Sequence, residues 1–433
     1  MESERWRRIE GLFHRAVLLD ALERAAFVDA ECGADDELRA ELERLLENDD
    51  AVDDAFSRLE KRAPPRTEDA LLGHNLGAYR VTARIAAGGM GVVYRAERSD
   101  GLFQQEVAIK LIRAGHATDW MLRRFEFERR ALASLQHPCI ARLYDGGTTD
   151  DGCPYFVMEL VRGEPIDRYC ERERATIAER LRLFVQVCRA VHFAHQSLIV
   201  HCDLKPANIL IDERGVPRLL DFGIARLLAD ENGAASSAGP GTIARVLTPE
   251  YAGPEQLSGA AVTTSIDVYS LGVVLYELLT GRRPFRSESR SPADWERLIR
   301  EQTPQRPSTS ASRVEGETST DLPATSFRST PAGLRRALRG DLDRIVLMAL
   351  RKEPERRYAS VQEFADDIER HLAGRPVRAR DNSMAYSASK FVLRNRVAVA
   401  AAVVVLAALL FGLYSARAGE RVAAAEALHA RME

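Results

Sequence analysis

The chain has 433 residues, of which 45% are hydrophobic, and its formal net charge is −3. This length exceeds what one ordinary core organises, so two or more folding units are expected, and the apolar content argues against a mainly disordered chain. The near-neutral charge gives no global bias toward nucleic acid or anionic membranes, and six scattered cysteines without a CxxC pair or zinc-ligand spacing indicate a reducing compartment.

Residues 1–50 carry the apolar period of helices. Trp6 and Phe13 share one face of a first predicted helix, and Asp35 stands where the N-cap of a later helix belongs. The segment predicts a small helical unit, interpreted as a packing or docking appendage, with a regulatory partner site as the alternative. Its acidic start lacks the apolar run of a secretory signal. Residues 51–76 lose this period and predict a linker.

Short alternating runs begin at Tyr79. YRVTARI, GVVYRAE and EVAIKLI predict three strands, the first two joined by the glycine-rich stretch AAGGMG at 86–91. Glycines there let backbone N–H groups approach phosphates, although such a cluster alone more often marks a hairpin turn. A charged amphipathic helix is expected from about Asp119 to Leu135. It carries Glu128, whose simplest interpretation is a surface ion pair with a neighbouring arginine.

The next stretch carries the acidic residues. YFVMELV at 155–161 predicts an apolar strand that ends in a hinge, and Leu181 to Gln196 predict a helix with one long apolar face. HCDLKPAN follows at 201–208 and LLDFGIAR at 219–226. Two acids and an asparagine on short loops after apolar runs suit a site that holds metal-bound phosphates and orients a hydroxyl nucleophile.

Together these motifs resemble the core of eukaryotic-like, or bacterial-type, serine/threonine protein kinases. The match joins VAIK at 107–110, HxDLKxxN and, thirteen residues after Asn208, DFG. Glu128 stands nine residues before His137, where the family places the glutamate that pairs with the strand lysine. The resemblance covers about Tyr79 to Leu372. It implies an α+β, bilobal protein-kinase fold over 79–372, with a small β-rich N-lobe and a large helical C-lobe.

The resemblance also implies ATP and Mg²⁺ as cofactors, with Mn²⁺ as an acceptable substitute. Asp203 would accept the proton of the substrate hydroxyl, and Lys205 would neutralise the transferring phosphoryl group. Lys110, paired with Glu128, would hold the α- and β-phosphates. Asn208 and Asp221 would hold the metal. The nucleotide-binding positions would be Ile85, Ala86, Gly88, Gly89, Gly91, Val93, Ala108, Lys110, Met158, Glu159 and Val161.

Further contacts are implied by the same resemblance. The lysine two positions after Asp203 is typical of serine/threonine rather than tyrosine kinases. Met158 would border the adenine, a role compatible with ordinary core packing, and the backbone of Glu159 and Val161 would bind the adenine edge. The structural contacts expected are those of Thr248 with Asp203 and Lys205, of Glu255 with Arg357, and of Asp267 with the catalytic-loop backbone.

Two residues depart from the family pattern. Ala86 replaces the first loop glycine, which would stiffen the loop or weaken nucleotide affinity. Cys202 replaces the arginine that commonly reads a phosphate on the activation loop, so phosphorylation of Ser236, Ser237 or Thr242 would not be sensed in the usual bidentate way. For Cys202 itself, an inert, half-buried thiol is expected over a redox sensor.

The end of the chain changes in composition. Residues 302–331 are rich in Ser, Thr and Pro and predict a mobile insertion with candidate self-phosphorylation sites. Residues 373–396 form a basic segment. Residues 397–414 carry no charge, and eighteen helical residues span about 27 Å, enough for a bilayer core. A buried soluble helix is the alternative.

The basic side precedes the apolar run, which places the kinase in the cytoplasm and the C-terminus outside the inner membrane. Residues 415–433 predict a short extracytoplasmic tail. Because similar bacterial chains often continue into extracytoplasmic repeats, a short member or a truncated one is expected.

The sequence therefore predicts a single-pass, membrane-tethered serine/threonine protein kinase that transfers the ATP γ-phosphate to protein hydroxyls, its own among them. The expected partners are ATP, protein substrates and the lipid bilayer through 397–414; no nucleic acid is expected, and a homodimer is left open. The rival is a pseudokinase or nucleotide-binding scaffold, favoured by Ala86 and Cys202 but opposed by the intact catalytic set. A receptor whose signal enters through a separate membrane protein is compatible with either.

Overall fold

The computed structural model describes residues 71–88, 91–101, 104–112, 132–222, 248–258, 262–286, 292–311, 330–380 and 395–429, with shorter stretches between 27 and 39 and between 386 and 392. Outside the described residues lie Gly89, Glu128, the linker up to residue 70 and most of the small helical unit predicted for residues 1–50. The chain divides into two compact units. One holds 1–118, 146–158 and 229–242, and the other holds 119–145, 159–228 and 243–433.

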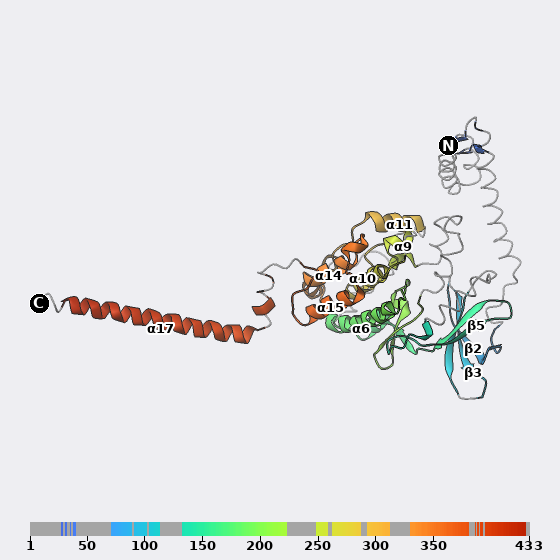
Figure 1. Ribbon diagram of the computed structural model, residues 1–433, viewed down its shortest axis with the longest axis horizontal. Coiled ribbons are helices and arrows are strands. Elements are labelled where there is room, and N and C mark those ends of the chain that lie inside the picture. Colours follow the sequence, from blue (N-terminus) through green and yellow to red (C-terminus); the bar gives the residue numbers. More distant parts are fainter. Residues whose placement is uncertain are drawn as a thin grey trace. The chain divides into compact units, whose positions relative to one another are not determined.

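The N-terminal unit is built on a six-stranded sheet of order β1-β2-β3-β4-β6-β5 (Figure 1). The three predicted strands are present as β2 (Tyr79–Gly88), β3 (Gly91–Arg98) and β4 (Glu106–Ile112), paired antiparallel. Alternation along β3 buries Val92, Tyr94 and Ala96. The other strands are β1 (Asn75–Leu76), β5 (Leu143–Thr148) and β6 (Pro154–Glu159). Of the N-terminal helices, fragments are described, and there Asp35 accepts from the Leu38 amide at 3.0 Å, the predicted cap.

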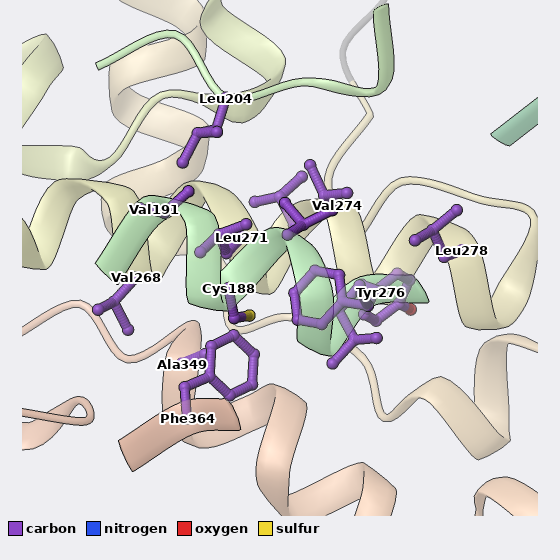
Figure 2. Packing of buried hydrophobic residues seen from close by; sticks show 14 of the residues in the cluster. Cys188, Val191, Leu204, Val268, Leu271, Val274, Tyr276, Leu278, Ala349 and Phe364 are labelled. Atoms are coloured by element: carbon purple, nitrogen blue, oxygen red, sulfur yellow. The ribbon is translucent and has the colours of Figure 1, made fainter. Parts of the chain in front are cut away.

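The second unit is helical and packs around α10 (Thr264–Thr280), whose side chains are nearly all buried. Figure 2 shows Leu271 and Val274 of α10 among Val191 of α6 (Ile177–Gln196), Ala349 of α14 (Asp341–Ala349) and Phe364 of α15 (Val361–Leu372). Gly272 allows the close approach of α10 to α14, because a Cβ there would lie 2.9 Å from that of Ala349. Such a core gives the active-site loops a rigid support.

The remaining elements of this unit are short. They are α5 (Ile166–Arg172), α9 (Pro254–Leu257), α11 (Pro292–Glu301), α12 (Pro307–Ser310), α13 (Pro331–Leu338), the 3-10 turns η1 (Pro206–Asn208), η2 (Pro249–Tyr251) and η4 (Pro354–Arg356), and a small sheet of β7 (Gly163–Pro165), β8 (Ile209–Asp212) and β9 (Pro217–Leu219).

The structure corrects the prediction for the start of the mobile insertion at 302–331. Residues 307–311 are packed, because the amide of Ser308 donates to Asp343 Oδ1 at 2.8 Å and its hydroxyl donates to Oδ2 at 2.7 Å. Pro307 starts a short helix here, and Ser308 bonds a buried carboxylate rather than marking disorder. The prediction of a mobile segment is therefore wrong for these residues, and 312–329 lie outside the described part of the chain.

The C-terminal helix α17 runs from Arg396 to His429 (Figure 1). It includes the predicted apolar run and continues into the predicted alanine-rich tail. Within the described residues, no helix has the length and apolar character needed to cross a bilayer. The predicted membrane span is thus not supported there and stays a prediction.

Candidate active site

The backbone of HCDLKPAN is anchored from below by Asp267, a fully buried carboxylate in the first turn of α10. Its Oδ2 accepts from the amide of His201 at 2.8 Å, and its Oδ1 accepts from the amide of Cys202 at 2.9 Å. His195 Nε2 lies 2.7 Å from Oδ2. The predicted anchoring role of Asp267 is confirmed. The contact of His195, which lies on the helix predicted at Leu181 to Gln196, was missed.

Cys202 adopts a left-handed backbone conformation, with φ of +64°. This conformation costs an L-residue other than glycine roughly 1–2 kcal/mol, so surrounding bonds must hold it. They come from Asp267 on the amide and from Gln256 Nε2, which donates to the carbonyl of Cys202 at 2.9 Å. Cys202 is 4% exposed, so the thiol is buried rather than half-buried as expected, which favours the inert interpretation.

The predicted base, cation and hydroxyl lie in mutual contact. Lys205 Nζ is 2.8 Å from Asp203 Oδ2, and it donates to Thr248 Oγ1 at 2.8 Å. The Thr248 hydroxyl in turn donates to Asp203 Oδ1 at 3.3 Å. Asn208 Nδ2 donates to Asp203 Oδ2 at 3.0 Å and to its carbonyl at 2.7 Å. The predicted placement of Thr248 is confirmed, and the Asp203 carboxylate is held on both oxygens.

His201 connects this loop to the segment that carries Asp221. Its Nε2 donates to the carbonyl of Leu220 at 2.8 Å, and its ring packs at a tilt against that of Phe222, 4.7 Å between centroids. Burial lowers the pKa of His201, so the imidazole is neutral and can donate from one nitrogen while accepting the Asp203 amide on the other. The amide of Leu220 donates to the carbonyl of Asn208 at 2.8 Å, which brings the two predicted metal ligands onto adjoining backbone.

The residues predicted to hold a metal fit a hard divalent cation. Asn208 spends its amide N–H groups on Asp203, so its amide oxygen is the group left to ligate, and Asp221 supplies a carboxylate. Asp221 is left-handed, with φ of +51°, at the turn that presents it. Within the described residues, no cluster of three or more His, Cys, Asp or Glu side chains forms a metal site. An amide oxygen and a carboxylate suit a divalent cation whose remaining ligands come from phosphate oxygens and water.

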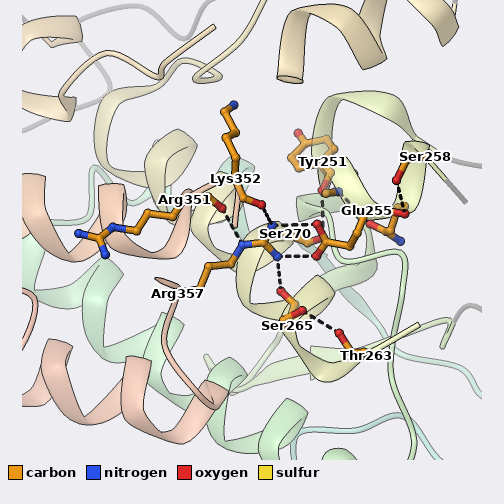
Figure 3. Close-up of polar contacts among 11 residues, drawn as sticks. Tyr251, Glu255, Ser258, Thr263, Ser265, Ser270, Arg351, Lys352 and Arg357 are labelled. Carbon is orange, nitrogen blue, oxygen red and sulfur yellow. Dashed lines mark hydrogen bonds and ion pairs between the residues drawn. The ribbon is translucent and has the colours of Figure 1, made fainter. Parts of the chain in front are cut away.

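Glu255 and Arg357 form the predicted ion pair (Figure 3). The guanidinium donates to the two carboxylate oxygens at 2.5 and 2.8 Å, and also to the carbonyls of Arg351, Lys352 and Ser265. Arg357 is 4% exposed and stacks over the ring of Tyr269. Because every N–H direction is used, this pair fixes the segment after Thr248 to the helical core.

In the N-terminal unit, three predicted nucleotide residues form one cross-strand row. Ala86 pairs with Val93 between β2 and β3, and Val93 pairs with Lys110 between β3 and β4. Gly91 has φ of +150°, and a Cβ there would lie 2.0 Å from the carbonyl oxygen of Leu111, so only glycine fits. Ile85 is half exposed at the edge of this row. Ala86, Val93 and Lys110 therefore lie side by side on three neighbouring strands.

Glu159 is held more firmly than the sequence indicated. Its amide donates to the carbonyl of Arg142 at 2.8 Å, and its carboxylate accepts from the Arg142 amide at 3.2 Å and from the Arg218 guanidinium. Arg218 lies on β9, the strand that leads to Asp221. No motif marks Arg218 or Gln256, since a single long polar side chain gives no periodic signal.

Comparison with known proteins places the chain among protein kinases. A family model described as "Protein kinase domain" matches residues 79–367. Serine/threonine-protein kinase PknB of Mycobacterium tuberculosis is 33% identical over 311 residues, covering 71% of this chain and 45% of that protein. A probable serine/threonine-protein kinase of Corynebacterium efficiens is 37% identical over 309 residues, covering 70% and 43%. PrkC of Bacillus subtilis is 40% identical over 222 residues, covering 51% and 33%.

This chain thus spans less than half the length of each of these relatives. Among solved structures, the kinase domain of Mycobacterium tuberculosis PknI aligns with 69% of this chain and 97% of that domain, at 26% identity and a TM-score of 0.48. The family model alone covers well over half of the chain. The chain belongs to the protein kinase domain family.

Proposed function

We propose that this chain is a serine/threonine protein kinase that transfers the γ-phosphate of ATP to protein hydroxyls, its own among them. The observation that carries the proposal is the Thr248 hydroxyl, which bonds both Asp203 and Lys205. A threonine hydroxyl already fits between the base and the cation, so an acceptor hydroxyl meets the groups it requires. Relatives named serine/threonine-protein kinases support the same activity.

The chemistry follows from positions and charges. Asp203 orients the acceptor hydroxyl and takes its proton as the oxygen attacks, while Lys205 neutralises charge on the phosphoryl group. Asn208 and Asp221 would hold the divalent metal of the nucleotide, proposed as Mg²⁺, which supplies charge neutralisation on the phosphates. In the N-terminal unit, Lys110 would hold the α- and β-phosphates.

The rival is a pseudokinase, and labelled ATP distinguishes the two. Wild type, Asp203→Asn and Lys110→Met are incubated with Mg²⁺, labelled ATP and either the chain itself or a basic protein acceptor. The kinase proposal requires phosphate incorporation by wild type that drops at least a hundredfold in both variants. Wild type no better than the variants on every acceptor would instead establish a scaffold, and intact nucleotide binding would then identify its ligand.

We further propose that residues 397–414 tether the kinase to the inner membrane, with the kinase in the cytoplasm. The sequence there carries no charge. In the structure its large side chains are uncovered, Val397 and Phe411 being 78% and 73% exposed. A helix that is apolar on all sides requires an apolar surrounding. No helix among the described residues is long and apolar enough to cross a membrane, so this proposal depends on the sequence and that exposure.

Fractionation tests the tether. The full-length chain is expected in the membrane fraction, resistant to carbonate wash and released by detergent. The basic segment at 373–396 precedes the apolar run and Arg417 follows it. Protease accessibility at these two places therefore reports the orientation of the chain in the membrane. Full-length chain recovered from the soluble fraction without detergent would refute the tether and leave the kinase proposal untouched.

A further inference from the structure

The basic segment after the last kinase helix is docked on the helical unit, a contact that its composition did not predict. Val377 is 4% exposed and Tyr386 is 7% exposed, values of a folded core rather than of a tether. Neither residue belongs to a periodic apolar run. Something specific must therefore hold them, and two buried carboxylates do so.

The first carboxylate is Asp367 of α15, which is fully buried. Its Oδ1 accepts from the amide of Arg378 at 2.5 Å, and its Oδ2 accepts from the amide of Ala379 at 2.8 Å and from the hydroxyl of Tyr358 at 2.9 Å. Two successive backbone amides on one carboxylate fix the chain direction at this point. The Arg378 guanidinium adds a contact with Glu363 on the same helix at 3.1 Å.

The second carboxylate is Asp341 at the start of α14, 7% exposed. Lys390 Nζ lies 2.6 Å from Oδ2, and the Tyr386 hydroxyl donates to Oδ1 at 3.0 Å. The Arg380 guanidinium lies 3.6 Å from Oδ1 and 4.2 Å above the Tyr386 ring. The Tyr386 oxygen also accepts from the Val377 amide at 3.2 Å. This phenol therefore connects the start of the segment to Asp341.

The charges agree with this geometry. Burial alone would raise the pKa of Asp341, but the nearby His371, Lys390 and Tyr386 side chains outweigh it and hold that pKa well below the ordinary range. The carboxylate is therefore ionised at neutral pH and matched by two cations of the basic segment, Arg380 and Lys390.

We propose that the face of α14 and α15 around Asp341 and Asp367 is a docking site for residues 377–380, Tyr386 and Lys390 of this same chain, and that it holds the helical unit on a short connection to α17. Only residues 391–395 separate Lys390 from α17. Helical bonds continue the path, from the Asn395 amide to the carbonyl of Phe391 and from the Val399 amide to that of Asn395, each 2.9 Å.

The docking changes how far the kinase unit can move from α17. Fully extended, residues 391–395 reach about 17 Å, whereas an undocked segment from 375 to 395 would reach roughly 70 Å. A docked kinase would therefore act on acceptors close to the base of α17, and an undocked one would sample a much larger volume. The inference concerns the docking alone and requires neither phosphoryl transfer nor membrane insertion.

Amide hydrogen exchange tests the docking in the full-length chain, with detergent present if the chain fractionates with membranes. The amides of Val377, Arg378 and Ala379 report directly, because their partners are the docking groups. Lys390→Met and Tyr386→Phe are the variants, and Arg297→Met, which removes the cation of an exposed pair on α11, is the control of equal charge. Amides of α6 report on the integrity of the fold.

We expect these three amides to be protected at least a hundredfold over an unstructured chain in wild type, and to exchange at least tenfold faster in both docking variants but not in the control. Exchange in wild type at the rate of an unstructured chain would overturn the proposal. So would unchanged exchange in both variants. Because both substitutions lie on the segment and not on α14 or α15, faster exchange of α6 amides would also count against a separable docking site.

Discussion

Asp267→Asn is the substitution that tests the buried anchor of the catalytic loop. Asp267 Oδ2 accepts two bonds, from the His201 amide and His195, and Oδ1 accepts one, from the Cys202 amide. An asparagine keeps one acceptor oxygen, so its NH₂ group faces the Cys202 N–H at 2.9 Å. One buried donor is then left unsatisfied, at about 1–3 kcal/mol, and the other bonds lose their charge assistance. The expected loss of unfolding free energy is about 2–4 kcal/mol.

The same substitution acts on catalysis through Cys202. Without the anchor, its left-handed backbone relaxes and Asp203 moves with it, and a misplacement of about 1 Å costs on the order of a hundredfold in rate. Phosphate transfer is expected to fall at least tenfold in kcat. Adding Cys202→Gly, which removes the steric cost of positive φ, is expected to restore part of the rate.

Asp343→Asn provides the control, because Asp343 is also a buried carboxylate, and its bonds come from Ser308 and Gly340 and not from the loop. It should lower stability in urea unfolding while leaving kcat per folded molecule unchanged. If the unfolding free energy of Asp267→Asn stays within 0.5 kcal/mol of wild type and its kcat within twofold, the anchoring argument is refuted. An equal loss of kcat in the Asp343→Asn control would also refute it.

Gly272→Ala should destabilise the chain by about 1–3 kcal/mol in urea unfolding, since its Cβ would lie 2.9 Å from that of Ala349, and an unchanged midpoint would contradict this close packing. Burial lowers the pKa of Lys352, which lies over the Phe285 ring, to about 8. The unfolded chain therefore binds more protons between about pH 8 and 10.5, so stability should gain a rising contribution across this window that Lys352→Met abolishes. Urea midpoints measured at intervals of half a pH unit check this slope. Finally, since Cys202 cannot bind a phosphate as an arginine does, phosphatase treatment should change the specific activity less than twofold, and a tenfold loss would contradict it.

Much of the site was predictable because motif spacing reports on chemistry that tolerates few residue types. Asp203, Lys205 and Thr248 meet as the resemblance implied, and so do Glu255 and Arg357. The roles assigned to these side chains in phosphoryl transfer stay predictions, as does that of Glu128, which lies outside the described residues. The motif spacing predicted which of these side chains would contact one another. It carried no information about the residues that hold them in place.

The supporting contacts were missed for a physical reason. Tyr386 and Val377 are buried singly, within the basic segment at 373–396, so no period of 2 or 3.6 residues marks them. Ser308 was assigned to a mobile insertion because the Ser, Thr and Pro content of residues 302–331 resembles that of disordered segments. Its hydroxyl and its amide nevertheless donate hydrogen bonds to Asp343. In both cases a buried carboxylate far along the chain makes the polar segment fold, and composition over a short window cannot reveal that partner.

Cys202 shows how such buried contacts replace a missing surface one. An arginine at this position would be held by a phosphate on the activation loop, which is present only after phosphorylation. Here the backbone of Cys202 is held in the left-handed region by Asp267 and Gln256, both fully buried and present at all times. Two such bonds, one of them charge-assisted, contribute together about as much as the roughly 1–2 kcal/mol that the conformation costs. The loop can therefore hold Asp203 in place without a phosphate, and control of this kinase is better sought where the chain is tethered, at Asp341 and Asp367, than on its activation loop.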